Sequence, residues 1–198
     1  MNDRNNQLSA AIVRHIRDVE AAMDHAEHSI DERLSIEWNE AFDRVFRKSD
    51  WYYSDENSWD GWFCPQRWTS DGGRKRRTEA WFDIVSLGGD DYHSWLANFV
   101  AGPPHAALQF STTGSKAKLL PIYEEEKSTI AQLRGLNFIQ EGTTFHIPME
   151  LDAEELAQGF EQDDLTAAIH VFDETAMLLE KALPSFDALH LAITRADN

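Results

Sequence analysis

Cysteine is almost missing from this chain of 198 residues, because Cys64 is its single thiol. One cysteine cannot form a disulfide within the chain, and nothing in the sequence has the spacing of a zinc cluster. Phe63 and Pro65 flank the thiol, and such apolar surroundings keep thiols inert. We therefore expect a cytoplasmic protein with a structural cysteine and no metal site.

Long apolar runs are also missing. No stretch reaches the roughly 18 apolar residues that a membrane-spanning helix needs. Residues 1–18 scatter charges among their apolar positions, which is not the pattern of a secretory signal. We expect no membrane association and no export by that route.

Basic residues are scarce, with 18 Lys and Arg against 35 Asp and Glu and a net charge of −17. The imbalance is concentrated in residues 119–198, which hold 16 acids and 4 bases. A negative field repels phosphate backbones, so nucleic acid is disfavoured as a ligand. Two interpretations remain open: a surface that only keeps the chain in solution, or one that selects a basic protein partner.

Catalytic and cofactor motifs are absent as well. There is no Gly-x-Ser-x-Gly, and neither Gly72-Gly73 nor Gly88-Gly89 continues into a phosphate-binding glycine loop. The sequence predicts no cofactor, and it favours a protein that binds over one that catalyses.

Proline and glycine do not occur between Arg4 and Lys48, which predicts helix. The apolar positions of this segment step by four and three residues, as on one helix face: Ile12, Ile16, Val19, Met23, Ala26 and Ile30. A single helix would be about 67 Å long, whereas a compact chain of this size has a radius of gyration of about 16 Å. Either the helix restarts near Ser29, where Ser29 and Glu32 fit a capping box, or its overhang pairs with a second copy in a homodimer.

Tryptophan is plentiful, and six of the seven lie between Trp51 and Trp95. Each buried indole removes roughly 150–250 Å² from water, so this stretch is expected to supply the core. Short aromatic runs separated by turn residues predict an antiparallel meander. The run from Thr78 to Leu87 has no clean polar face, which predicts a central strand covered on both sides.

The remaining chain divides into short elements. Residues 92–101 are read as a short helix or another strand, with helix favoured. We also expect a strand at 106–111, a helix from Pro121 to Gly135, and a hairpin with a Glu141-Gly142 turn. Asp152 and Asp163 are expected to cap two further helices, with Pro184 ending the second and Ser185 starting a last one.

The predicted fold is therefore α+β in a single domain, 1–198. It combines a long N-terminal helix or helix pair (1–48), an antiparallel sheet of about five or six strands (50–148) and acidic C-terminal helices packed on the sheet (152–198).

Two groups of residues are candidate partner-binding sites. Trp59 and Trp62 straddle an Asp-Gly turn, where indoles often stay partly exposed and can stack on a ligand. The second group is the acidic set on the C-terminal helices: Glu154, Glu155, Asp163 and Asp164. The function that these features favour is binding, and inhibition, of a macromolecular partner, as in an immunity or antitoxin factor.

The alternative is a divalent-metal-dependent hydrolase of the phosphodiesterase or nuclease class. Asp83, with Asp90 or Asp91, would hold the metal, and Glu125 with Lys127 would complete the site. Such sites place the Glu and Lys on a strand, whereas these two fall in a predicted helix.

Overall fold

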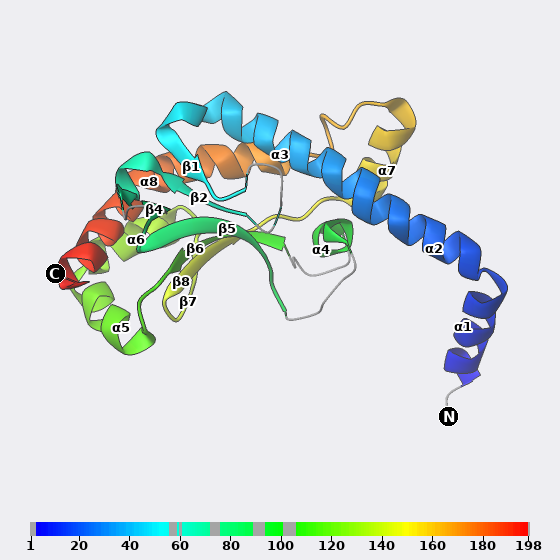
Figure 1. The fold of residues 1–198 in the computed structure, drawn as a ribbon, viewed down its shortest axis with the longest axis horizontal. Helices are drawn as coiled ribbons and strands as arrows, with labels where there is room; N and C mark the ends of the chain where they lie inside the picture. The colour runs from blue at the N-terminus through cyan, green and yellow to red at the C-terminus, as the bar shows by residue number, and fades with distance from the viewer. Residues whose placement is uncertain are drawn as a thin grey trace.

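The computed structural model describes residues 3–55, 59, 61–71, 76–88, 94–100 and 106–197. Within these residues an antiparallel six-stranded sheet is combined with helices, and the class is α+β, as the sequence predicts (Figure 1). No helix of the described chain is long and apolar enough to cross a membrane.

The sheet has the strand order β1-β2-β5-β6-β8-β7, with every neighbouring pair antiparallel. Its strands are β1 (Trp51–Tyr53), β2 (Trp62–Pro65), β5 (Ala80–Ser86), β6 (Ala106–Thr112), β7 (Ile139–Glu141) and β8 (Thr144–Pro148). A separate ribbon pairs β3 (Ser70–Asp71) with β4 (Arg76–Arg77). The hairpin predicted around Glu141-Gly142 is confirmed, with Gly142 in the left-handed region at φ 61°.

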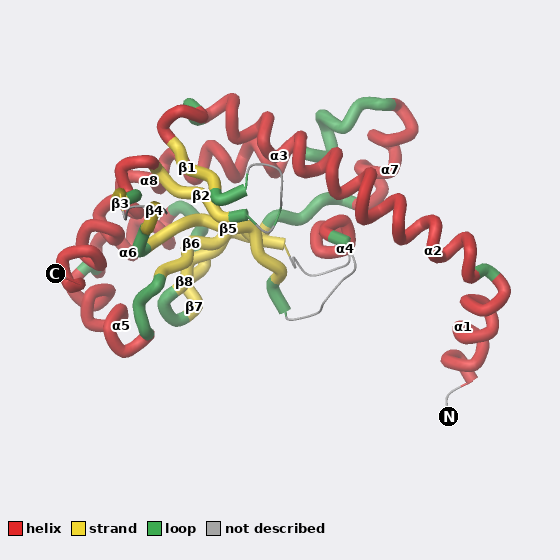
Figure 2. Tube along the Cα trace, viewed as in Figure 1, coloured by secondary structure: helices red, strands yellow, loops and turns green. Residues whose placement is uncertain are grey.

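Helices occupy both ends of the chain and the segments between strands, as Figure 2 shows in red. The N-terminal ones are α1 (Asp3–Arg14), α2 (Ile16–His25), a π-helical turn (Ala26–Ile30) and α3 (Asp31–Val45). The others are α4 (Trp95–Val100), α5 (Lys116–Glu125), α6 (Lys127–Gly135), α7 (Ala153–Gln162) and α8 (His170–Asp197), with short 3-10 turns at Lys48–Asp50 and Gln66–Trp68.

The core lies between one face of the sheet and the helices α3 and α8. Phe82 and Phe110 on adjacent strands contact Phe186 of α8, with ring centroids 5.1 and 4.7 Å away. Trp38 of α3 meets Phe172 of α8 edge to face at 5.8 Å. These contacts make a single aromatic layer that holds both long helices against the same face of the sheet.

The tryptophan-rich stretch contributes only part of this core. Trp51, Trp59 and Trp68 are buried, whereas Trp62, Trp81 and Trp95 are half-buried. Strand β5 is the third of six in the described sheet, so its central place is confirmed. Its side chains alternate between buried and half-buried up to the exposed Ser86, so one side of the strand is covered less completely than the other.

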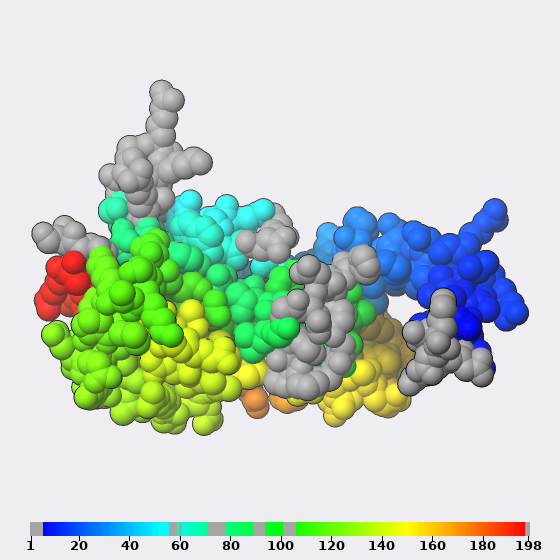
Figure 3. Space-filling model, turned by 90° about the horizontal axis from the view of Figure 1, so that it is seen from below, coloured from blue at the N-terminus to red at the C-terminus, as the bar shows by residue number. Residues whose placement is uncertain are grey.

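The opposite face of the sheet carries none of the ring contacts that α3, α5 and α8 make with the strands in the described chain. Seen from below, the green and yellow part of the chain forms much of the surface, and α8 is largely hidden behind it (Figure 3). We call this side of the sheet the open face, although Cys64, Ser111 and His146 on it are buried.

The N-terminal helix breaks at His15, not near Ser29. His15 has φ −118° and ψ 23°, outside the helical region, and separates α1 from α2. At Ser29 the helix continues through the π-helical turn, and Ile30 makes no side-chain cap to α3. A π-helical turn adds one residue per turn, which changes the helix face without ending the helix.

Two prolines expected at helix ends lie inside helices instead. Pro121 is within α5 and Pro184 is within α8. Both are exposed, so each ring lies on the solvent side while neighbours such as Ile122 and Phe186 stay buried. Packing of the inner face outweighs the lost backbone hydrogen bond.

Asp163 is also placed differently from the prediction. It does not cap α8 but ends α7 in the left-handed region at φ 55°, and α8 starts only at His170. Asp152 does cap α7, since its Oδ1 accepts from the backbone N–H groups of Glu154 and Glu155, each at 2.9 Å.

Candidate functional site

A helical arm, defined here as residues 3–28, extends from the body to the N-terminus (Figure 1). None of the residues of α2 is buried. The larger apolar side chains of the arm are partly exposed, with these exposed fractions: Leu8 60%, Ile12 40%, Val13 75%, Ile16 46% and Met23 36%. Several positions of the predicted apolar seam are therefore exposed within one chain, and the break at His15 puts Ile12 on a different helix from Ile16 and Met23.

The arm joins the body at a fixed point, Asp31. Its carboxylate oxygens accept the backbone N–H groups of Trp95 and Leu96, both at 2.7 Å, at the start of α4. Its backbone carbonyl accepts the Nε1–H of Trp59 at 3.1 Å. Burial raises the pKa of Asp31, and the two N–H donors oppose that effect. The root of the arm is held in place by three separate hydrogen bonds.

Two of the four acidic candidates lie in the first turn of α7 and two directly after its last turn, and all four are exposed. The pKa of Asp164 is lowered by its hydrogen bonds with the hydroxyl and backbone N–H of Thr166. We call Glu154, Glu155, Asp163 and Asp164 the α7 patch. Gly159 fixes the turn behind it, because a Cβ there would lie 2.9 Å from the carbonyl oxygen of Asp164.

Helix α7 lies beside the root of the arm (Figures 1 and 2). A hollow of about 290 Å³, part of it open to solvent, separates the two and is lined by Arg33 of α3 with Phe160 and Asp163 of α7. Phe160 is 39% exposed at its edge. Acidic and apolar groups thus meet on one side of the molecule.

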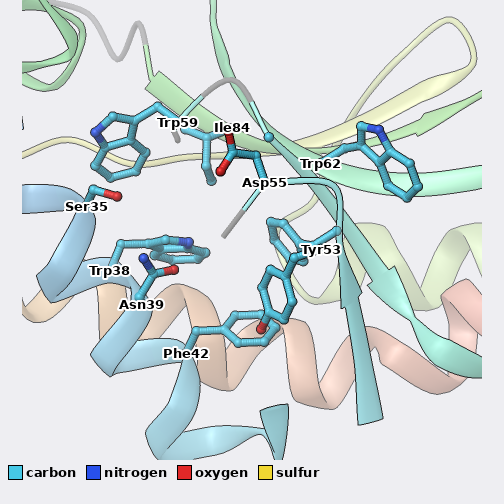
Figure 4. Close-up of a pocket in the computed structure, with 11 residues that line it drawn as sticks. Ser35, Trp38, Asn39, Phe42, Tyr53, Asp55, Trp59, Trp62 and Ile84 are labelled. Atoms are coloured by element: carbon cyan, nitrogen blue, oxygen red, sulfur yellow. The ribbon is translucent and has the colours of Figure 1, made fainter. Parts of the chain in front are cut away.

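The two tryptophan candidates differ in burial. Trp59 is 7% exposed and packs on Phe99 at 5.2 Å, so the expected exposure is wrong for this residue. Both line a small pocket with Trp38 and Tyr53, although the indole ring of Trp62 points outward in Figure 4. Trp62 is half-buried on the open face of the sheet.

A row of polar side chains crosses the open face. Direct cross-strand partners project to the same side of a sheet, and the register pairs Trp62 with Asp83, Asp83 with Gln109, and Gln109 with His146. Sequence reasoning named Asp83 and Trp62 but missed Gln109 and His146, because a pairing between strands 37 residues apart leaves no local signal.

Hydrogen bonds in this row converge on Asp83. Trp81 Nε1 donates to Oδ2 at 3.1 Å, and the Ser111 hydroxyl donates to Oδ1 at 3.0 Å. Gln109 Nε2 donates in turn to Ser111 Oγ at 2.9 Å. Burial raises the pKa of Asp83, and the hydrogen bonds from Trp81 and Ser111 oppose it. In the described chain no cation pairs with this carboxylate.

His146 ends the row with an unpaired atom. Its side chain is 4% exposed, and its Nδ1 has no hydrogen-bond partner within the described residues. Burial lowers the pKa of His146, although the charge of Glu141 opposes the shift. Burial therefore favours the neutral form of the imidazole.

The groups proposed for a hydrolase are only partly placed. Glu125 lies in α5, as the sequence predicts, while Asp83 lies on β5. Asp90 and Asp91 lie outside the described residues. In the part of the chain that is described, no three His, Cys, Asp or Glu side chains are grouped so that they could hold a metal ion.

Comparison with known proteins gives no relative: no family model, no curated protein and no solved structure matches this chain.

Proposed function

We propose that this chain is a cytoplasmic binding protein that engages a basic protein partner and blocks it, in the manner of an immunity or antitoxin factor. The observation that carries the proposal is the helical arm. Five of its larger apolar side chains are exposed by 36–75%, on α1 and α2, and no residue of α2 is buried.

Exposure of this kind has an energetic consequence. Each large apolar side chain gains roughly 1.5–3 kcal/mol when it moves from water into a contact. Ile16 and Met23 are seven residues apart and lie on one side of α2, and Ile12 lies on α1, before the break at His15. All three are partly exposed. An apolar stripe rimmed by polar residues is typical of a protein interaction surface.

Charge supports a basic partner. The chain carries −17 overall, and the exposed α7 patch stands next to the root of the arm. A negative surface speeds the approach of a positive one, and this electrostatic attraction acts mainly on the association rate. The arm would then supply apolar contacts and the α7 patch would supply attraction.

A second copy of the chain is the competing occupant of the arm. The four-three spacing from Ile12 to Ile30 suits a helix pair, but a homodimer brings together two chains that each carry −17. That repulsion favours a partner of opposite charge.

The test begins with capture of the partner from native cells by the full chain, followed by measurement with the purified partner. The variant Ile12→Ser/Ile16→Ser/Met23→Ser removes the stripe. The control Arg17→Ser/Asp18→Ser changes two exposed residues on the other side of α2 and leaves the net charge unchanged. We expect the triple variant to lose at least about tenfold in affinity, and the control to bind as the wild type does.

Two results would contradict the proposal. One is a purified partner that binds the triple variant as tightly as the wild type. The other is a wild-type dimer in analytical ultracentrifugation that the triple variant abolishes, since the arm would then be occupied by a second copy.

A further inference from the structure

The open face of the sheet carries a built polar site that partner binding through the arm does not use. Its members come from four neighbouring strands, β2, β5, β6 and β8, and are placed side by side by the strand register: Trp62, Trp81, Asp83, Gln109, Ser111 and His146. Adjacent strands are about 4.8 Å apart, so the row from Asp83 to His146 spans about 10 Å.

Asp83 is a carboxylate with donors but no counter-ion. Trp81 and Ser111 each give it one neutral hydrogen bond, whereas a carboxylate has about four lone-pair positions. No ion pair with Asp83 forms in the described chain. A cationic donor is the group that this carboxylate lacks.

His146 supplies the second, independent observation. Its Nδ1 is buried and unpartnered at the other end of the row. Buried polar atoms in folded proteins are nearly always hydrogen-bonded, so an unpaired one indicates that another group belongs beside it. A neutral imidazole can accept a hydrogen bond at Nδ1 when Nε2 carries the proton.

Aromatic rings border the carboxylate. Trp62 lies 6.3 Å from Trp81 between ring centroids, and Tyr52 lies 5.2 Å from Trp62. All three rings are half-buried. Indole faces attract cations, and they attract the planar guanidinium group both by charge and by stacking.

We propose that the open face binds a small aliphatic guanidine, with the guanidinium group on Asp83 against Trp62 and Trp81, and a polar group at the far end of the ligand beside Gln109 and His146. A metal ion suits the site less well, because one carboxylate and one imidazole are too few ligands. An anion is disfavoured by Asp83 and by the net charge of −17.

The probe is agmatine, a guanidinium and an amine joined by a four-carbon chain of the right length to span the row. Its matched control is N-carbamoylputrescine, in which a neutral urea replaces the guanidinium. By isothermal titration we expect agmatine to bind at least about tenfold more tightly than the urea, the difference expected when a charge-assisted hydrogen bond is lost.

The variant Asp83→Asn should lose this preference for agmatine. Asp187→Asn is the matched control, because Asp187 also accepts an indole N–H, from Trp68 at 2.7 Å, but is already paired with Arg67. In the wild-type protein, agmatine should shift the indole N–H resonance of Trp81 and leave that of Trp68 in place, a readout that needs no variant.

Three outcomes would overturn the proposal. They are equal binding of agmatine and the urea, retention of agmatine binding by a folded Asp83→Asn variant, and no shift of the Trp81 resonance at saturating agmatine. None of these outcomes tests the helical arm, so the guanidine site and the proposed function are tested independently.

Discussion

At the scale of single residues, Asp31 shows how one side chain fixes the geometry of the arm. Its carboxylate holds the start of α4 while its carbonyl holds the indole of Trp59. This role cannot be predicted from the sequence, because Asp31 lies 64 residues from Trp95. In the sequence it resembles the other acidic residues of a polar helix face. Only the folded chain brings the pair together.

Replacement of Asp31 by alanine should therefore be costly. It leaves two backbone N–H groups of α4 without their acceptor, and each such loss costs about 1–3 kcal/mol. We expect Asp31→Ala to lower the free energy of unfolding by at least about 2 kcal/mol in urea titrations. Glu32→Ala, at the exposed neighbour, should change it by less than about 0.5 kcal/mol. Equal effects of the two changes would mean that the Asp31 contacts contribute little.

His146 should make stability depend on pH. Burial lowers its pKa below the ordinary value of 6.5, so the unfolded chain takes up a proton that the folded chain resists. This contribution to stability is complete above pH 6.5 and is lost as the pH falls through the lowered pKa. We expect the wild type to lose stability between about pH 7 and pH 5 more steeply than His146→Gln, by up to about 1.4 kcal/mol per pH unit.

Urea titrations at several pH values would measure the two slopes. His190 also has a pKa lowered by burial, but it is present in both proteins, so the difference between slopes isolates His146. Parallel slopes would show that His146 titrates alike in the folded and unfolded chains.

At the scale of elements, the spacing of apolar residues and the turn residues predicted the elements well. Capping residues and prolines predicted the helix ends less well. The four-and-three spacing of Leu165, Ile169 and Phe172 coincides with buried positions. The boundaries at Ser29, Pro121, Asp163 and Pro184 were wrong. Capping and proline effects are worth only about 1–3 kcal/mol each, and packing of α3, α5 and α8 on the sheet exceeds them.

Substitution of Pro184 tests whether the packing of α8 outweighs the cost of a proline within the helix. It is exposed within α8, so alanine in its place leaves no cavity and restores a backbone N–H donor to the helix. We expect Pro184→Ala to raise the free energy of unfolding by about 1 kcal/mol or more. Lys181→Ala on the same helix should have little effect. If Pro184→Ala is less stable than the wild type, α8 depends on a bend at Pro184.

The arm and α3 should respond differently to the same substitution. Ile16 is 46% exposed on α2, whereas Leu34 is fully buried on α3. In thermal and urea unfolding we expect Ile16→Asp to change stability by less than about 0.5 kcal/mol. Leu34→Asp should cost several kcal/mol, because it buries a charge. A large loss for Ile16→Asp would place the arm stripe in a contact already formed by the free protein.

At the scale of the whole molecule, composition predicted surface character but not which surfaces lie together. The −17 charge and the seam from Ile12 to Ile30 are visible in the sequence. The α7 patch beside the arm and the row across four strands are not, since both arise from long-range pairing. The burial of Trp59 is not visible in the sequence either, because its neighbour Phe99 is far away along the chain.

The central claim is that the arm is a binding element, and hydrogen exchange of its backbone amides tests it most directly. An arm with no buried side chain in α2 should open easily and exchange fast in the free protein. Saturation with the purified partner should slow exchange in residues 6–28 by about tenfold or more, and the control Arg17→Ser/Asp18→Ser should show the same protection. Unchanged exchange in the arm while the partner protects other residues, or strong protection of the free chain that grows with its own concentration, would contradict the account.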